Sequence, residues 1–574
     1  MVLKSSDLAM RASHRQSYSM DLILHYLQET LSGIGPFVLL LGLLVFVHEL
    51  GHFLVAKWCG VRVEVFSLGF GKKLLQYKHG DTTYCISMIP LGGYVKMFGD
   101  NFAAEVSEEE KSHSFIHKPV SQRIAVVLAG PLMNLFFAIF LFTAIGFIGD
   151  RQPAAVVGDI ASTTQAYKDG FRPGDKILSV ENKSVDGWTQ LIDRISQSNE
   201  KELSFQVQRG NESIQISSRP EISKNENIFS SQEKVPQIEG LSFESNAALI
   251  GVPSPQSPAA LAGLKNLDLI LKVNEKDVSS FRSFKTAVIE GLKTGSEVQM
   301  EVQSFAEGKR GPKRTISLAS SSTDFDALGI EFAETYVLKV KDPSPAHKAG
   351  LKSGDKIVSI DGKPVSNWTN ILDSIKNFDP KSEGNISLLA MREGKNIPLQ
   401  LVPEMTQLMN EKGQEENRFT IGILSSNLNV GPETVLYRPD GLLGKFSYGL
   451  SQTWKWTEFT VMSMVRLFQG VVSYKNIGGV ITIGRVANHS YDAGLSVFLK
   501  TMAIISINLF LLNLLPVPVL DGGHLVFYGL EALKGSPVSM KKLEIAQQVG
   551  LMLLLLLMAF ALFNDVSNLF SSQW

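Results

Sequence analysis

The sequence predicts a polytopic α-helical membrane protein, with about four transmembrane helices and with α+β domains inserted between them. Three observations predict this class. Long apolar runs lie near both ends of the 574-residue chain, the segment between them is as polar as an ordinary soluble protein, and that segment repeats itself. A chain of this length also exceeds what one hydrophobic core usually organises, so several domains are expected.

Four apolar segments are long enough to cross a bilayer as helices. We expect transmembrane helices at 34–58, 121–149, 496–520 and 545–564. The first run is too long for a cleavable signal peptide, and no small-residue cleavage site follows it. Residues 1–33 are expected to form an N-terminal extension, in which Met20 is an alternative start to Met1.

Lysine and arginine side chains indicate the orientation, because they concentrate on the cytoplasmic side of membrane proteins. They gather in 59–120, which we expect to be a β-rich, membrane-associated loop. The connection between the last two spans carries Lys534, Lys541 and Lys542 and is placed on the same side. The large segment between the second and third spans then faces outward.

Charge and cysteine content exclude two further classes. The 56 acidic and 55 basic residues nearly cancel and form no long basic block, so nucleic acid is not expected as a partner. The only two cysteines are Cys59 and Cys85, which excludes a disulfide framework.

The outward-facing segment contains three copies of one pattern, in which a Gly-Asp type of turn leads into a strand and an amphipathic helix follows. The copies recur roughly every ninety residues, a spacing that indicates three small domains. They resemble PDZ domains, which bind extended segments or peptide C-termini at a sheet edge, and we expect them at 155–220, 236–320 and 328–405. The alternative is that they act only as spacers or as a size filter.

Two parts of the segment are expected to depart from this pattern. Leu267 stands where the other copies have Gly174 and Gly354, so the second turn is expected to differ, and whether that copy binds a ligand stays open. After the third copy, 404–441 reads as a polar connector. Residues 440–476 then favour an amphipathic helix at the membrane surface over a fifth span, because three charged side chains in one span are costly in hydrocarbon.

The first apolar run contains His48-Glu49-Leu50-Gly51-His52. Positions i and i+4 of a helix share a face, so both imidazoles can bind one metal ion while Glu49 serves as general base. A charged residue at the centre of a membrane helix costs roughly 2.5–3.5 kcal/mol, so this cluster needs a partner or a metal. The alternative is a buried polar cluster that only joins helices.

A catalytic zinc ion normally has three protein ligands, so a third ligand is required. Asp521 is the preferred candidate, because it follows two prolines that halt the third span and precedes two glycines that allow close backbone approach. His524 is the competing ligand.

The motifs at 48–52 and 513–524, together with Gly-Gly-Tyr-Val-Lys-Met at 92–97 and Ala-Gly-Pro-Leu-Met-Asn at 129–134, resemble the site-2 protease family of intramembrane zinc metalloproteases, in its regulator-of-sigma-E protease branch. The resemblance covers nearly the whole chain from Met20. The chain departs from the family pattern at two points. It has three PDZ-like copies instead of one or two, and it carries Ile-Gly-Gly-Val at 477–480 where the family tends to have Gly-Pro.

The resemblance implies a zinc metalloendopeptidase of the bacterial inner (cytoplasmic) membrane, with periplasmic PDZ domains and an active site near the cytoplasmic side. It implies Zn²⁺ bound by His48, His52 and Asp521, with Glu49 as general base and acid on the zinc-bound water. It also implies single-span substrates of the anti-sigma-factor type, cut after a first cleavage, and remnant signal peptides as a second class.

A helical substrate must be unwound before it is cut, which requires a site that holds it extended. We expect Gly92, Gly93, Tyr94 and Val95 to form a β-edge for this purpose, with Asn513 as a further backbone clamp. The alternative for 92–95 is a plain structural turn.

Two other classes of function compete with the protease. A membrane-tethered PDZ scaffold would be expected to have lost Glu49 or a ligand, and none is missing. A zinc transporter or sensor would not need a general base beside its metal.

Overall fold

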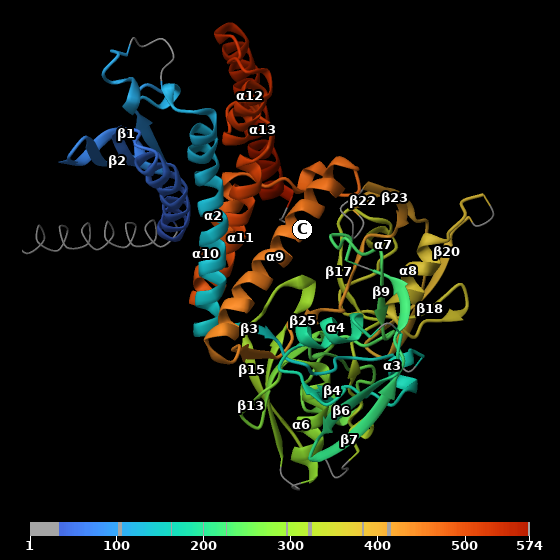
Figure 1. The fold of residues 1–574 in the computed structure, drawn as a ribbon. Coiled ribbons are helices and arrows are strands. Elements are labelled where there is room, and N and C mark those ends of the chain that lie inside the picture. Colours follow the sequence, from blue (N-terminus) through green and yellow to red (C-terminus); the bar gives the residue numbers. More distant parts are fainter. Residues whose placement is uncertain are drawn as a thin grey trace, which may run out of the picture. The chain divides into compact units, whose positions relative to one another are not determined.

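The computed structural model describes residues 34–571 except for 101–105, 162, 199, 226, 294–296, 320–323, 382–383 and 410–414. The predicted extension 1–33 and the choice between Met1 and Met20 therefore lie outside the described residues. The chain forms two compact units (Figure 1), of which one comprises Met1–Arg151, Glu226–Gln232 and Leu436–Trp574 and the other comprises Gln152–Asn225 and Glu233–Val435.

Among its described residues, the first unit contains four helices that are long and apolar enough to cross a membrane: Ile34–Trp58, Val120–Ile148, Leu495–Asn513 and Lys541–Ser567. Three of them lie close to the predicted bounds. The third, α11, ends at Asn513, well before the predicted end at residue 520. Pro516 and Pro518 explain the difference, because proline cannot donate to a helix and disfavours helical geometry in the residue before it.

After the helix Ile34–Trp58, the described elements of this unit are β1 (Val63–His79), β2 (Thr82–Met97), η1 (Lys111–His113), η2 (Phe115–His117), α2 (Val120–Ile148), α9 (Gly441–Phe468), η5 (Tyr474–Asn476), α10 (Val480–Asp492), α11 (Leu495–Asn513), α12 (Asp521–Lys534) and α13 (Met540–Ser571). Helix α2 is central to them and lies beside α11 (Figure 1). One apolar core joins α2 to the helix Ile34–Trp58, α9 and α11, with Leu40, Phe142 and Ile507 fully buried.

Helix α9 covers the predicted membrane-surface region and packs against both α2 and α11. Gly449 permits close approach to α2, since a Cβ there would lie 2.9 Å from the carbonyl oxygen of Ile139. The Thr460 hydroxyl donates to Asn508 of α11 over 2.9 Å. The helix is not one of the four membrane-length apolar helices, and its position at the membrane surface stays a prediction.

The predicted β-rich loop is a sheet made by β1 and β2, whose pairing doubles back. Residues 63–68 pair with 93–97 on one side, and 65–68 pair with 83–86 on the other, while 73–79 pair with the outer side of 82–87. Residues 93–97 are consequently an edge strand, and no further strand pairs with them within the described part of the chain.

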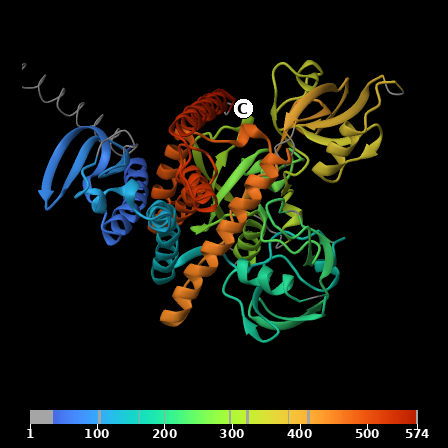
Figure 2. The same ribbon diagram turned by 45° about the horizontal axis from the view of Figure 1, so that its top comes forward.

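The second unit contains three α+β modules, each with its own hydrophobic core. Figure 2 distinguishes them by colour, from teal-green through green to gold. The first module has a sheet in the order β5-β4-β6-β7, the second has the order β15-β14-β12-β11-β16, and the third has the order β19-β18-β20-β21. In each module an amphipathic helix, α4, α6 or α8, contributes its apolar face to the core.

The elements of this unit are β3 (Asp150–Pro153), α3 (Gln165–Lys168), β4 (Lys176–Val180), β5 (Lys183–Ser184), α4 (Trp188–Ser196), β6 (Leu203–Arg209), β7 (Glu212–Ser218), β8 (Glu221–Lys224), β9 (Lys234–Gln237), β10 (Ser245–Asn246), β11 (Leu249–Gly251), α5 (Pro258–Leu261), β12 (Asp268–Val273), β13 (Lys276–Asp277), α6 (Phe281–Lys293), β14 (Val298–Ser304), η3 (Ala306–Gly308), β15 (Lys313–Leu318), η4 (Asp326–Leu328), β16 (Glu331–Phe332), β17 (Val337–Val340), α7 (Pro345–Lys348), β18 (Lys356–Ile360), β19 (Lys363–Pro364), α8 (Trp368–Lys376), β20 (Ile386–Arg392), β21 (Lys395–Leu401), β22 (Glu404–Met409), β23 (Glu415–Thr420), β24 (Ile423–Ser425), β25 (Asn429–Val430) and β26 (Thr434–Tyr437).

A buried aspartate follows the repeated turn in each module and pairs with an arginine. The pairs are Asp175 with Arg209, Asp268 with Arg314, and Asp355 with Arg392. Each carboxylate also accepts a hydrogen bond from the backbone amide three residues earlier, over 2.8 Å. The shared pair explains why the aspartate recurs in the sequence, since a buried carboxylate needs such partners.

We expected the turn of the second module to differ from the other two, but its backbone has the same conformation. Leu267 adopts φ 64°, in the same left-handed region as Gly174 and Gly354. Its side chain is buried in a small cluster with Leu249, Ala333, Tyr336 and Leu338, so apolar packing supports a conformation that a bulky residue rarely adopts.

The expected polar connector at 404–441 is also corrected. It contains the hairpin β22–β23 and the short strands that follow it. Phe419 and Ile421 pack into or against the third core.

Candidate metal centre

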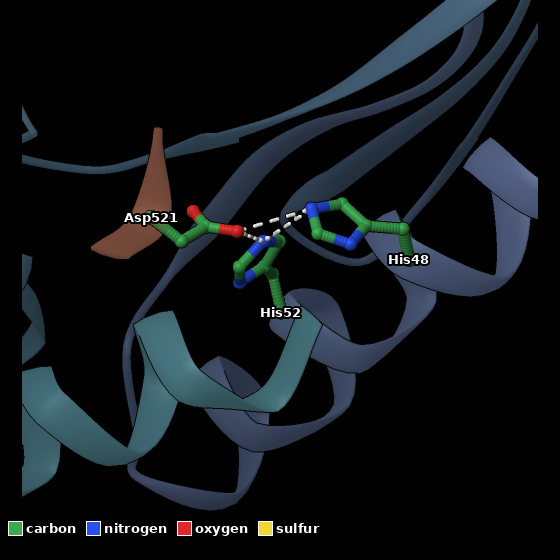
Figure 3. A group of neighbouring side chains, drawn as sticks. All are labelled: His48, His52 and Asp521. Atoms are coloured by element: carbon green, nitrogen blue, oxygen red, sulfur yellow. Dashed lines mark hydrogen bonds and ion pairs between the residues drawn. The ribbon is translucent and has the colours of Figure 1, made fainter. Parts of the chain in front are cut away.

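Two imidazoles and one carboxylate meet at a single point in the first unit (Figure 3). His48 and His52 lie one turn apart on the helix Ile34–Trp58, and their Nε2 atoms are 3.3 Å from each other. Asp521 Oδ2 lies 3.2 Å from the Nε2 atom of His48 and 3.5 Å from that of His52. These are the three ligands that the sequence predicts.

The spacing fits a tetrahedral zinc ion. Zinc binds nitrogen and oxygen ligands at about 2.0–2.2 Å, and tetrahedral angles then separate neighbouring ligand atoms by roughly 3.3–3.6 Å. The three observed separations, 3.2, 3.3 and 3.5 Å, agree with this geometry. One imidazole from each of two helical positions and one carboxylate are also the donor types that zinc prefers.

Asp521 reaches the histidines because the chain turns sharply after α11. Helix α12 begins at Asp521 itself. Gly522 and Gly523 follow, and a Cβ on either would collide with backbone of the turn, at Leu515 and Val517 respectively. The two glycines are therefore required for the compact turn that presents the carboxylate.

Electrostatics keep Asp521 ionised. Burial alone would raise the pKa of its carboxyl, but hydrogen bonds from His48 and His52 outweigh burial and hold that pKa well below its usual range. His524, the competing ligand, does not belong to the three-residue group among the described residues. Burial lowers the pKa of His524, and its ring packs near Tyr528.

Helix α2 packs against the rings of both histidines. His52 Nδ1 lies 2.9 Å from the carbonyl oxygen of Val126, and His48 Nδ1 lies 3.3 Å from the side-chain nitrogen of Asn134. Gly130 lies between them, where a Cβ would collide with the His52 ring and approach His48 Cε1 to 2.9 Å. The Ala-Gly-Pro-Leu-Met-Asn motif at 129–134 thus supplies space and an outer partner to the ligands.

A buried ion pair fixes α12 to α2. Arg123 of α2 donates to both carboxylate oxygens of Glu531, over 3.0 and 2.6 Å, and its guanidinium lies 4.8 Å from the ring centre of Tyr528. Arg123 also donates to the backbone of Lys118. Since α12 carries Asp521 at its first turn, this pair holds the far end of the helix that presents the third ligand.

Glu49 lies beside the ligands and against the sheet edge. A Cβ on Gly93 would be 3.2 Å from the Glu49 side chain, and the backbone of Val95 is placed to hydrogen-bond with the Glu49 carboxylate. Of the five predicted substrate-binding residues, four therefore lie in the strand segment next to Glu49. Asn513 is the last residue of α11, and its role as a clamp stays a prediction.

The sequence predicts the ligands but not the residues that orient them. Val126, Gly130 and Asn134 contact the histidines, and Arg123 with Glu531 supports the aspartate. The motif at 129–134 was a signal for two of these positions, Gly130 and Asn134. No local pattern connects Arg123 with Glu531, which are 408 residues apart.

Two histidines of an HExxH motif and one carboxylate from a distant part of the chain, arranged to bind a single metal ion, define a zinc metalloprotease. The model of peptidase family M50 matches residues 36–557, and the chain belongs to this family.

Curated relatives agree with this class. Regulator of sigma-E protease RseP from Escherichia coli (strain K12) is 31% identical over 546 residues, which cover 93% of this chain and 98% of that protein. Protease RseP from Yersinia pestis is 30% identical over 542 residues, with the same coverage. A protein of Neisseria meningitidis serogroup A whose name describes a zinc metalloprotease is 31% identical over 543 residues, again with 93% and 98% coverage.

Among solved structures, a PDZ domain protein from Parabacteroides distasonis aligns with 47% of this chain and 95% of its own length, at 9% identity and a TM-score of 0.14. A score of this size supports no conclusion about the modules.

Proposed function

We propose that this zinc metalloprotease hydrolyses peptide bonds within the transmembrane segments of single-span membrane proteins. One observation carries the proposal: the ligand atoms of His48, His52 and Asp521 converge at zinc spacing, and both histidines belong to a helix that is long and apolar enough to cross a membrane. A peptide bond reaches such a site only within the bilayer or at its edge.

The residues have distinct roles in this proposal. Zinc, when bound, polarises the scissile carbonyl and lowers the pKa of a water molecule to about 7. His48 and His52 bind through Nε2, and Asp521 binds as a carboxylate. Glu49 accepts the proton of the attacking water and returns it to the leaving amine.

The relatives named as regulators of sigma-E protease favour substrates of the anti-sigma-factor type, cut after a first cleavage by another protease. Remnant signal peptides are the second substrate class. We place the protein in the bacterial inner membrane, with the three modules in the periplasm as PDZ-like domains. There they would bind peptide C-termini or extended segments and exclude untrimmed substrates by their bulk.

The test of this function is co-expression with a panel of truncated single-span membrane proteins. We expect the wild type to release cytoplasmic fragments from at least one of them, and Glu49→Gln to release none. A wild type that contains no zinc when purified, or that cleaves only soluble proteins, would contradict the proposal.

The edge strand 93–97 is proposed to hold the substrate extended. It lies beside Glu49, and one of its sides is unpaired within the described residues. An extended peptide that pairs with this side would expose its carbonyls next to the metal ligands, which a helix cannot do. Proline at Val95 is a poor test of this idea, because it removes an amide that faces Glu49 itself.

Cross-linking provides a cleaner test. In a Glu49→Gln protein in which Cys59 and Cys85 are replaced by serine, we expect Lys96→Cys to form a disulfide with a cysteine near the substrate's cleavage site. Lys96 is suitable because its side chain is exposed and belongs to the edge strand.

The matched control is Tyr77→Cys, on the opposite edge of the same sheet and also exposed. It should cross-link at least about tenfold less, because a substrate held beside Glu49 pairs with only one edge. Equal yields at the two positions would show that the sheet edge does not select the substrate.

The Arg123–Glu531 pair is expected to be essential as a pair. Removing one partner leaves a buried unpaired charge, which costs about 3–5 kcal/mol, whereas replacing both with apolar residues is often close to neutral. We therefore expect Arg123→Leu to lower the melting temperature and to abolish cleavage, and Arg123→Leu/Glu531→Leu to recover most of both. Thermal unfolding in detergent and substrate cleavage measure the two effects. A double variant as impaired as the single one would contradict the role of the pair.

A further inference from the structure

We propose that Asn134 is the positioning residue of His48, and that its side-chain oxygen accepts a hydrogen bond from His48 Nδ1–H when the metal centre is loaded. The inference rests on the proposed metal centre and extends it beyond the three ligands. Asn134 is fully buried in the middle of α2, and its carboxamide nitrogen lies 3.3 Å from His48 Nδ1.

The two histidines differ in how their surroundings determine which ring nitrogen carries the proton. His52 Nδ1 faces the carbonyl oxygen of Val126 over 2.9 Å, and a carbonyl can only accept. His52 therefore carries its proton on Nδ1 and leaves Nε2 free as a ligand atom. His48 also directs Nε2 toward Asp521 and His52, so its own proton has to be on Nδ1.

This requirement determines which end of the Asn134 side chain can serve His48. An NH₂ group cannot accept a proton, so it pairs with His48 Nδ1 only while that nitrogen is an acceptor. The carboxamide oxygen of Asn134 is buried and finds no hydrogen-bond partner among the described residues. A half-turn of the carboxamide exchanges the two ends and brings that oxygen to His48 Nδ1–H.

The backbone of Asn134 has a separate structural role. Its carbonyl oxygen accepts a hydrogen bond from the Ser506 hydroxyl of α11 over 2.8 Å. This contact joins α2 to α11 and does not involve the side chain. Changes to the side chain can therefore alter His48 while the helix contact is retained.

Helix α2 therefore contributes one supporting residue for each of the three metal ligands. Val126 orients His52, Asn134 orients His48, and Arg123 holds the helix of Asp521. Outer partners of this kind fix the ring orientation and the tautomer of a ligand, and losing one typically reduces metal affinity 10–100-fold.

The experiment measures zinc affinity of the purified full-length protein by competition with a chromophoric chelator. Absorption of the cobalt-loaded protein reports the ligand geometry without reference to activity. We expect Asn134→Leu to weaken zinc binding roughly 10–100-fold and to change the cobalt spectrum. Asn134→Asp, which keeps an acceptor oxygen at the same distance, should stay within a few-fold of the wild type.

The matched control is Asn508→Leu. Asn508 is also a membrane-helix asparagine with an interhelical hydrogen bond, to Thr460, but it does not contact a ligand. It should leave zinc affinity and the cobalt spectrum unchanged. If Asn134→Leu does not accumulate, Asn134→Ala replaces it, with the same expected loss.

Two results would overturn the assignment. Wild-type zinc affinity in Asn134→Leu, or in Asn134→Ala, would show that the side chain does not act on His48. An equal loss in Asn134→Asp and Asn134→Leu would show that only the packing of the asparagine matters. A wild type that binds no zinc while His48→Ala behaves identically would instead overturn the metal centre itself, and the inference with it.

Discussion

Glu49→Gln is expected to reduce cleavage roughly 10²–10⁴-fold while the protein keeps its zinc. Glutamine retains the shape of the side chain but cannot accept the proton of water. Glu49 is not one of the three converging ligands, so its replacement leaves the group of His48, His52 and Asp521 intact. Single-turnover cleavage of a truncated single-span substrate in detergent, together with metal analysis of the same sample, measures both quantities.

Two comparisons make this result specific. His48→Ala should lose zinc as well as cleavage, since it removes a ligand atom. Glu110→Gln should keep both, because Glu110 pairs with Arg62 at an exposed site apart from the metal centre. A Glu49→Gln protein with more than about a tenth of wild-type activity would reject Glu49 as the general base.

Gly130→Ala is expected to weaken zinc binding at least about 100-fold with little loss of fold stability. The added methyl group would overlap the His52 ring, which is the end of a side chain and can move away. That movement breaks the hydrogen bond to Val126 and removes Nε2 from the metal. Chelator competition measures the affinity, and thermal unfolding of the zinc-free protein measures the stability.

A glycine elsewhere on the same helix provides the control. A Cβ on Gly146 would lie 3.4 Å from Lys445, a tight but tolerable contact, and Gly146 is remote from the ligands. Gly146→Ala should therefore bind zinc as the wild type does. If Gly130→Ala bound zinc equally well, the close packing of α2 on the histidines would not govern the site.

The features that can be predicted from the sequence are those set by residues close together in the chain. The spacing of His48 and His52 is a property of one helical turn, and the prolines before Asp521 break a helix wherever they occur. The repeated turns of the second unit likewise carry their aspartate at the same place in each copy. These features depend on neighbours in the chain, so a single sequence is enough to infer them.

The supporting contacts could not be predicted in the same way. Arg123 and Glu531 pair across 408 residues, and either could have been a solvated surface charge. The left-handed conformation of Leu267 could not be predicted, because it depends on packing against Tyr336 and Leu338, which belong to the next module. Such contacts depend on tertiary packing and leave no local pattern.

The location of the outer partners on α2 has a consequence for biosynthesis. The N-terminal part of the chain brings both histidines and α2 into place, but the carboxylate arrives only with Asp521, which is synthesised long after them. A ribosome-bound nascent chain thus holds an incomplete hydrolase.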